Sequence, residues 1–220
     1  MARNIGLYHA MGTYVFFTDA DCVADPLWLY NMLKCFGQKK GYAGFGGSIR
    51  RYMPQSSIER YGKNLARGQK DLQYLEHISH LPYIVLANAG FLKKNLIAVG
   101  GFDEDLISGG DVDICWKLGV KGYRIGICNT AVIYHKNRDT IKSYFKAYFR
   151  YAVYQSLLCK KYAKNKITIN PYPWKLLCKA LGSVIRFKIK NLRRFYDIIE
   201  AIAIISGDIY GAILFKVLYL

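Results

Sequence analysis

Short runs of β-branched, aromatic and aliphatic residues alternate with stretches of helical periodicity through the first 135 residues. The runs predict buried strands, because such residues favour the enclosed positions of a sheet. We expect strands at residues 13–18, 41–50, 83–89, 124–128 and 131–134. We expect helices at residues 25–36, 56–76, 91–99 and 111–120. Strands that alternate with helices predict an α/β domain.

Proline, glycine and aspartate positions set the expected ends of these helices. Asp25 before Pro26 predicts an N-cap followed by proline at the first helical position. Gly100, Gly101 and Gly122 predict helix ends. The helix after Pro26 is therefore expected to reach about residue 36.

The pattern changes at residue 140, where helical periodicity continues without intervening strands. Aromatic and small apolar residues recur at helical spacing to about residue 162, with lysines and arginine between them. Pro171 and Pro173 mark a hinge, and two further helices are expected at residues 174–190 and 192–218. We therefore expect an α/β domain over residues 1–139 and a basic helical region over residues 140–220.

Positive charge is concentrated in this helical region. Of the formal net charge of +17, residues 136–220 carry +13, from 17 lysines and arginines against 4 acidic residues. Such a surface suits an anionic membrane or nucleic acid. The aromatic and basic helix at residues 144–162 could stack bases, but such a stripe is more often core with a solvated basic face. Nucleic acid is therefore the less favoured partner.

The cysteines and the last apolar stretch bear on localisation. The six cysteines form no C-x-x-C pair and show no zinc spacing, which favours reduced thiols in a cytoplasmic protein.

In residues 198–220, Glu200, Asp208 and Lys216 fall on one arc of a helix. A charge at the centre of a spanning helix costs about 2.5–3.5 kcal/mol. We therefore predict an amphipathic helix on the inner face of the cell membrane; the alternative is a helix packed on its own domain or in a dimer.

Two acidic clusters lie beside apolar runs in this basic chain. Asp19 and Asp21 follow a predicted strand, where carboxylates suit a hard cation such as Mg²⁺ or Mn²⁺; an ordinary acidic turn is the alternative. Asp111 and Asp113 follow Gly109–Gly110 at the start of a predicted helix. A carboxylate there suits a general base beside a closely approaching substrate. It also simply stabilises a helix N-terminus, which is the alternative.

Three further residues are candidates for ligand contacts. Arg3 and Asn4 lie in a short predicted helix whose first residues could meet a diphosphate, although an arginine there is usually just solvated. His135 follows the strand at residues 131–134, where an imidazole suits a metal ion or a phosphate. A surface or internally satisfied histidine is the alternative.

Several motifs, taken in order, resemble one enzyme family. The run from Ala2 to Cys22, with Asp19-Ala20-Asp21, resembles the segment that carries the DxD motif of family 2 glycosyltransferases with the GT-A fold. The later segments match in the same order: residues 88–93 and 99–104 on the acceptor side, 110–118 as the second acidic motif, and 132–138 with 144–151 after it. The resemblance covers roughly residues 2–160 and implies a GT-A-like, partly Rossmann-like mixed sheet flanked by helices.

The resemblance implies a metal-assisted inverting transfer of a sugar from a nucleotide-sugar donor to a hydroxyl of a polysaccharide, lipid-linked or cell-envelope glycan acceptor. Asp111 would be the base that deprotonates the acceptor hydroxyl. Mn²⁺ or Mg²⁺ would be held by Asp21 and His135. The donor would contact Arg3, Asn4, Asp19 and Asp21, and the acceptor side would include Asn88, Gly110, Asp113 and Arg138.

Family members begin with two further β–α units that hold the nucleotide base, whereas this sequence starts at the helix before the DxD strand. We therefore expect a truncated domain with a sheet edge open to a partner chain. A non-catalytic remnant or partner subunit is the alternative function. A basic nucleic-acid-binding protein is the less favoured third.

Overall fold

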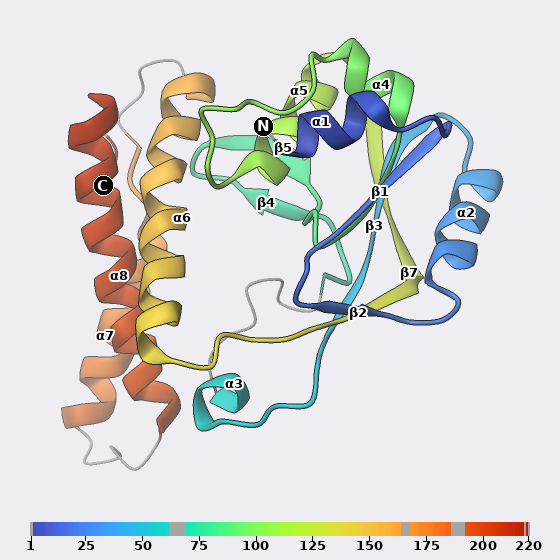
Figure 1. Cartoon of the computed structure of the whole chain (residues 1–220). Helices are drawn as coiled ribbons and strands as arrows, with labels where there is room; N and C mark the ends of the chain where they lie inside the picture. Colours follow the sequence, from blue (N-terminus) through green and yellow to red (C-terminus); the bar gives the residue numbers. More distant parts are fainter. Residues whose placement is uncertain (1, 62–68, 164–167, 186–191, 218, 220) are drawn as a thin grey trace. The chain divides into compact units, whose positions relative to one another are not determined.

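The computed structural model describes residues 2–61, 69–163, 168–185, 192–217 and 219. The chain forms two compact units, each described separately below (Figure 1). The first consists of Met1–Met53, Asn64–Glu76 and His80–Lys136, and the second of Pro54–Lys63, His77–Ser79 and Asn137–Leu220. The second unit thus takes two short segments from the part of the chain before residue 137.

A five-stranded mixed sheet forms the centre of the first unit, in the order β1-β6-β3-β7-β2. β3 and β7 are parallel, and the other neighbours are antiparallel. β4 and β5 form a separate two-stranded sheet. The strands are β1 (Tyr14–Thr18), β2 (Cys22–Ala24), β3 (Tyr42–Arg51), β4 (Gln73–Leu75), β5 (Ser79–Tyr83), β6 (Asn88–Leu92) and β7 (Arg124–His135). The expected mixed α/β fold is confirmed.

Helices cover both faces of this sheet (Figure 1). Trp28, Met32 and Phe36 of α2 (Trp28–Gln38) are buried in one core. The other core takes buried residues from three helices: α1 (Ala2–His9), α4 (Lys93–Ala98) and α5 (Gly110–Val120). Strand β1 separates the two cores, since Phe16 packs with the first and Phe17 with the second. Alternation along β1 therefore fixes which residues can reach each layer.

The helix α2 begins later than its aspartate and proline predicted. Asp25 forms a turn instead of a cap: its Oδ1 accepts a hydrogen bond from the Leu27 N–H at 3.0 Å, and its carbonyl oxygen accepts one from the Trp28 N–H at 2.9 Å. Leu27 occupies the N-cap position. The expected start at Pro26 is therefore two residues too early.

Two other predicted elements are wrong in part. Within the helix expected over residues 56–76, the described residues include α3 (Ser57–Tyr61) at its start and β4 where its end was expected; residues 62–68 lie outside the described part of the chain. Of the strand expected over residues 83–89, the two ends belong to β5 and β6, but residues 84–87 form the connection between them, although Ile84 and Leu86 are buried in the core. An apolar run that is buried as a connection looks like a strand in sequence.

The two strands expected at residues 124–128 and 131–134 are one strand, β7, with an irregularity. Gly47 of β3 pairs with Cys128, but its neighbour Ser48 pairs with Val132, so residues 129–131 bulge from the ladder. Side chains bind the bulged backbone: the Asn31 amide donates to the Thr130 carbonyl oxygen at 2.9 Å. The bulge therefore interrupts the apolar pattern without ending the strand.

A disulfide joins Cys35 of α2 to Cys128 of β7, across 93 residues. The expectation that the scattered cysteines remain reduced is wrong for this pair, because the fold brings together two cysteines that sequence spacing could not connect. Cys22, Cys115, Cys159 and Cys178 are free.

The second unit is helical, with α3, α6 (Ile141–Tyr162), α7 (Pro171–Ile185) and α8 (Leu192–Phe215). Thr140 and Ser143 form a capping box at the start of α6. Pro171 is the first residue of α7, so the prolines begin this helix instead of preceding it. α6 and α8 run side by side (Figure 1) and approach closely at Gly211, where a Cβ would lie 2.6 Å from the Val153 carbonyl oxygen.

Two of the three residues of the predicted charged arc, Glu200 and Asp208, face their own unit, whereas Lys216 follows the end of α8 and is exposed. Glu200 and Asp208 are each 1% exposed. Glu200 accepts hydrogen bonds from the hydroxyls of Tyr144 at 2.8 Å and Tyr172 at 2.5 Å, and Asp208 accepts one from the Asn170 amide at 3.3 Å. The expectation that these carboxylates form the water-facing side of an amphipathic helix is therefore wrong.

The outward side of α8 is apolar instead. Its exposed large side chains are Phe195, Ile202, Ile209, Tyr210, Ile213 and Leu214. Residues 195, 202, 209 and 213 recur at spacings of seven and four, so they lie along one face of the helix. By length and composition alone, Arg193–Phe215 would be able to cross a membrane.

Candidate functional site

Asp19 and Asp21 lie in a tight turn between β1 and β2. The Cys22 N–H donates to the Asp19 carbonyl oxygen at 3.1 Å, which closes the turn. The Lys136 N–H donates to the Asp21 carbonyl oxygen at 2.9 Å, which holds the turn against the end of β7. Both carboxylates are partly exposed and therefore accessible to a ligand.

His135 ends β7 directly beside this turn. It pairs with Cys22 in the antiparallel ladder of β2 and β7, and its Nε2 lies 3.5 Å from Asp21 Oδ1. The imidazole is buried, and its Nδ1 has no hydrogen-bond partner among the described residues. A carboxylate and an imidazole with spare coordinating capacity fit a divalent cation, and the imidazole suits Mn²⁺ better than Mg²⁺. Burial raises the pKa of the neighbouring Cys22 thiol to about 11.

Asp111 is the second residue of α5. Gly109, with φ of 78°, takes the N-cap position in the left-handed region that favours glycine. Asp111 Oδ1 accepts a hydrogen bond from the Val112 N–H at 3.0 Å. Burial raises the pKa of the Asp111 carboxyl; the Val112 hydrogen bond and the Arg3 charge oppose this shift, and the Asp19 charge adds to it. Asp111 is therefore a stronger base than an ordinary aspartate and interacts electrostatically with the DxD turn.

Arg3 lies next to the start of α5. A Cβ on Gly110 would lie 3.3 Å from Arg3 Nη1, and the guanidinium carbon lies 5.9 Å from the centroid of the Phe102 ring. The Arg3 side chain is exposed, so its charge is available to an anionic ligand as well as to Asp111. Arg3 thus lies beside the start of α5, where its charge acts on Asp111.

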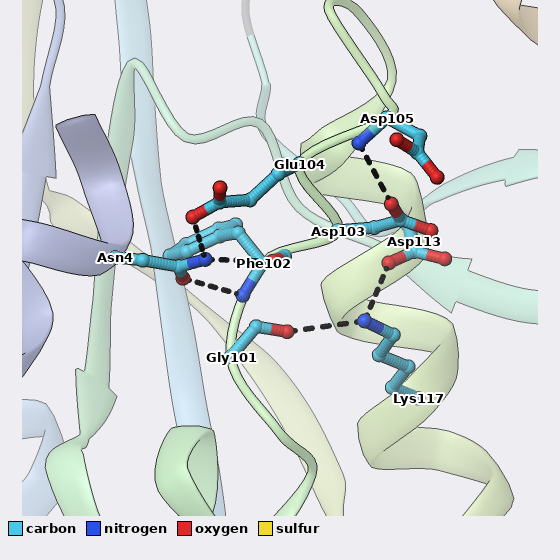
Figure 2. Close-up of polar contacts among 8 residues, drawn as sticks. All are labelled: Asn4, Gly101, Phe102, Asp103, Glu104, Asp105, Asp113 and Lys117. Carbon is cyan, nitrogen blue, oxygen red and sulfur yellow. Dashed lines mark hydrogen bonds and ion pairs between the residues drawn. The ribbon is translucent and has the colours of Figure 1, made fainter. Parts of the chain in front are cut away.

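The Asn4 side chain binds protein backbone. Its Nδ2 donates to the Phe102 carbonyl oxygen at 2.8 Å and to Glu104 Oε1 at 2.9 Å, and its Oδ1 accepts from the Phe102 N–H at 2.8 Å (Figure 2). The Asn4 hydrogen bond lowers the pKa of the Glu104 carboxyl. Asn4 therefore ties α1 to the loop that leads into α5, instead of pointing at a donor site.

Asp113 and Lys117 hold the same loop from the other side (Figure 2). Lys117 Nζ lies 3.1 Å from the fully buried Asp113 Oδ2 and donates to the Gly101 carbonyl oxygen at 3.1 Å. The spacing of four residues between Asp113 and Lys117 could have indicated this pair in sequence. Asp113 is thus in an ion pair, whereas the carboxyl of Asp111, two residues earlier, is influenced by the charges of Arg3 and Asp19.

Asn88, predicted on the acceptor side, lies in the interior with no exposed area. Its Nδ2 donates to the carbonyl oxygens of Ser48 at 2.9 Å and Ala131 at 3.0 Å, and its Oδ1 accepts from Trp28 Nε1 at 2.7 Å. These bonds connect β6 with β3, β7 and α2. Arg138, the remaining predicted residue, belongs to the second unit.

Sequence reasoning missed several of these residues. Lys117, Trp28 and Cys22 were not candidates, although each contacts or adjoins a predicted site residue. The buried amide of Gln69, which donates to the Gly47 carbonyl oxygen at 2.9 Å and accepts from the Val85 N–H at 2.5 Å, had no recognisable sequence signal.

A mixed sheet with carboxylates after β1 and at the start of α5 defines a GT-A glycosyltransferase fold. A mannosyltransferase from Pyrobaculum calidifontis, solved in complex with GDP-Man and Mn²⁺, superposes with a TM-score of 0.60 at 16% identity, covering 96% of this chain and 65% of that one. The family model "Glycosyl transferase family 2" matches residues 1–100. This match agrees with the resemblance to family 2 glycosyltransferases seen in the motifs of the same segment.

Curated relatives support the same family. Pre-mycofactocin glycosyltransferases of two Mycobacterium tuberculosis strains, CDC 1551 / Oshkosh and ATCC 25618 / H37Rv, are each 29% identical over 153 residues, or 67% of this chain. The match covers 32% of each relative, so the chain spans about a third of their length.

Proposed function

We propose that the chain transfers a sugar from a nucleotide-diphosphate sugar to a hydroxyl acceptor, by a single displacement that inverts the anomeric carbon. Two observations within one unit carry this proposal: the Asp21–His135 pair, and the Asp111 carboxyl at the start of α5, on which the charges of Arg3 and Asp19 act. A base and a site for a cation beside a diphosphate are the two requirements of such a displacement. A polysaccharide, lipid-linked or cell-envelope glycan is the proposed acceptor.

Asp111 accepts the proton of the acceptor hydroxyl as that oxygen bonds to the anomeric carbon. The bond from the anomeric carbon to the phosphate oxygen breaks at the same time, and its electron pair leaves with the nucleoside diphosphate. Arg3 stabilises the carboxylate form of Asp111 before the transfer. Because burial raises the pKa of Asp111, kcat/KM should fall as the pH drops through that pKa.

Asp21 and His135 are the proposed ligands of Mn²⁺ or Mg²⁺, and Asp19 is the proposed contact to the donor ribose. When bound, the cation neutralises charge that develops on the departing diphosphate. The Lys136 hydrogen bond to the turn keeps the Asp21 ligand beside His135 before the donor arrives.

Replacing Asp111 tests the base. Asp111→Asn should lower turnover about 10²–10⁴-fold and leave donor binding nearly unchanged. Asp105→Asn, an exposed acid in the loop before α5, is the matched control and should keep full turnover. A mild effect of Asp111→Asn together with a folded but inactive Asp113→Asn would show that the base is assigned to the wrong aspartate.

Titration calorimetry with a nucleoside diphosphate tests the donor site. Binding should require Mn²⁺ or Mg²⁺, and Asp21→Asn should abolish it, while Asp71→Asn, an exposed acid of the same unit, should not. Equal affinity with and without chelator removes the metal role. If no nucleoside diphosphate binds under any condition, the non-catalytic alternative is favoured. In that alternative, the free edge of β1, which lies at one end of the five-stranded sheet, pairs with a partner chain.

We further propose that the second unit binds an anionic membrane surface, which would place the protein on the inner face of the cell membrane. The apolar outward face of α8 supports this, because it leaves aliphatic and aromatic side chains exposed while the helix carboxylates are buried. Positive charge supports it independently: Lys142, Lys146 and Arg150 are exposed at spacings of four along α6.

Co-sedimentation with vesicles tests the membrane proposal. The protein should pellet with anionic vesicles, and high salt should release only part of it, since the apolar contact is insensitive to salt. A double variant, Ile209→Glu with Ile213→Glu, should reduce pelleting strongly, whereas Val120→Glu on the exposed side of α5 should not. Equal pelleting with neutral vesicles contradicts the electrostatic part, and absence of pelleting contradicts the whole.

A further inference from the structure

Three different ligand atoms converge beside the DxD turn. A carboxylate oxygen of Asp21, the sulfur of Cys22 and a ring nitrogen of His135 all lie within 4.8 Å of one another. The antiparallel pairing of Cys22 with His135 places these two side chains on the same face of the sheet, and the turn brings Asp21 to them. Strand register therefore fixes two of the three ligands, and the turn supplies the third.

The ligand set is not that of a purely hard cation site. Mg²⁺ and Mn²⁺ favour oxygen ligands and water, whereas a thiolate together with imidazole and carboxylate is typical of Zn²⁺ or Co²⁺. His135 is 8% exposed, and its Nδ1 has no hydrogen-bond partner among the described residues. The other ring nitrogen of this buried imidazole, Nε2, lies 3.5 Å from Asp21 Oδ1 and so faces the cluster.

We propose that Cys22 is a metal ligand that gives this site a high affinity for a thiophilic divalent cation, Zn²⁺ or Co²⁺, in competition with the cation that supports transfer. This inference rests on the proposed function only in that Asp21 and His135 serve both cations. On coordination the Cys22 thiol loses its proton to solvent as the metal–sulfur bond forms. Zn²⁺ then occupies Asp21 and His135 and excludes Mn²⁺ from them, so it should inhibit the enzyme.

Titration of the full chain with Co²⁺ alone tests this ligand directly. Thiolate ligation produces a sulfur-to-cobalt charge-transfer absorption in the near ultraviolet. We expect this band in the parent protein and in Cys178→Ser, which removes an exposed free thiol of the second unit, but not in Cys22→Ser. Circular dichroism and thermal unfolding of Cys22→Ser and Cys22→Ala establish that both variants fold.

Competition supplies the second measurement. Zn²⁺ should displace Mn²⁺ from the parent protein, which can be monitored by the paramagnetic signal of free Mn²⁺. In Cys22→Ser, the Zn²⁺ concentration needed for this displacement should rise at least about 100-fold, since even the loss of an outer-shell contact lowers metal affinity by 10–100-fold. Absence of the charge-transfer band from the parent protein, or an equal band in Cys22→Ser, overturns the proposal. Neither result requires a sugar donor, so Mn²⁺-dependent nucleotide binding can persist when the Cys22 proposal fails, and the band can persist when transfer fails.

Discussion

Replacing Asn88 by alanine should destabilise the first unit strongly. The buried amide makes three hydrogen bonds, to the carbonyl oxygens of Ser48 and Ala131 and from the indole N–H of Trp28. Alanine removes all three and admits no solvent to the buried partners. Each buried polar group that loses its partner costs about 1–3 kcal/mol.

The three losses are expected to total about 3–5 kcal/mol, because neighbouring effects do not add fully. This is a large share of the roughly 5–15 kcal/mol by which domains are stable. Asn31→Ala is the matched control. It removes an asparagine amide that also binds the bulged segment of β7, through the Thr130 carbonyl oxygen at 2.9 Å, but in an exposed position. Its expected cost is about 0.5–1.5 kcal/mol, the net value of one hydrogen bond.

Urea unfolding monitored by tryptophan fluorescence measures both variants, since Trp28 reports directly on the Asn88 contact. The midpoint of Asn88→Ala should lie well below that of Asn31→Ala. If the two midpoints agree while acceptor binding is lost only in Asn88→Ala, Asn88 binds ligand, as its motif position suggested, and the structural reasoning is refuted.

Three further predictions concern groups that the fold brings together. Reduction of the Cys35–Cys128 disulfide, or Cys35→Ser, should lower the free energy of unfolding by up to about 4 kcal/mol, as expected for a bond that closes a loop of 93 residues. In denaturant unfolding, a reducing agent should not change the midpoint of the Cys35→Ser variant. Burial raises the pKa of Asp208 to about 7, so between pH 3.8 and 7 the folded state keeps a proton that the unfolded state, with the ordinary pKa of 3.8, releases. The free energy of unfolding, measured relative to Asp208→Asn, should therefore be greatest below pH 3.8 and fall by up to about 4 kcal/mol as the pH rises to 7. Parallel pH profiles of the two proteins would contradict the burial argument. Lys117→Met removes the ammonium group that pairs with the fully buried Asp113 and should lower the free energy of unfolding by about 3 kcal/mol. The control Lys121→Met, at an exposed position, should lower it by less than about 0.5 kcal/mol. Equal changes in the melting temperature of the two variants would show that the ion pair contributes little.

Local patterns predicted the positions of the catalytic candidates well. Asp19 and Asp21 follow β1, and Asp111 lies in the first turn of α5, as the sequence indicated. Strand and helix periodicity, together with glycine at the left-handed position 109, are properties of a few consecutive residues. The order of the motifs indicated the resemblance to family 2 glycosyltransferases, with which the family-model match over residues 1–100 agrees.

The roles of Asn4 and Asn88 required the tertiary structure. Both amides lie in motifs that suggested ligand contacts, but their partners are backbone and side-chain groups of the protein that are distant in sequence, such as the Phe102 carbonyl oxygen, 98 residues from Asn4. An asparagine side chain has the same donors and acceptors whether it binds a ligand or a carbonyl group. Only the folded chain determines which of these partners is within 3 Å.

The sequence by itself determined the mixed α/β class, the family motifs and the charged arc of α8, because each depends on residue order along a short segment. The tertiary structure decided which way that arc faces. A helical period places Glu200 and Asp208 on one side but cannot specify whether water or protein lies there. Tyr144, Tyr172 and Asn170 come from other parts of the helical unit, and their hydrogen bonds draw the carboxylates inward and leave the apolar side of α8 exposed.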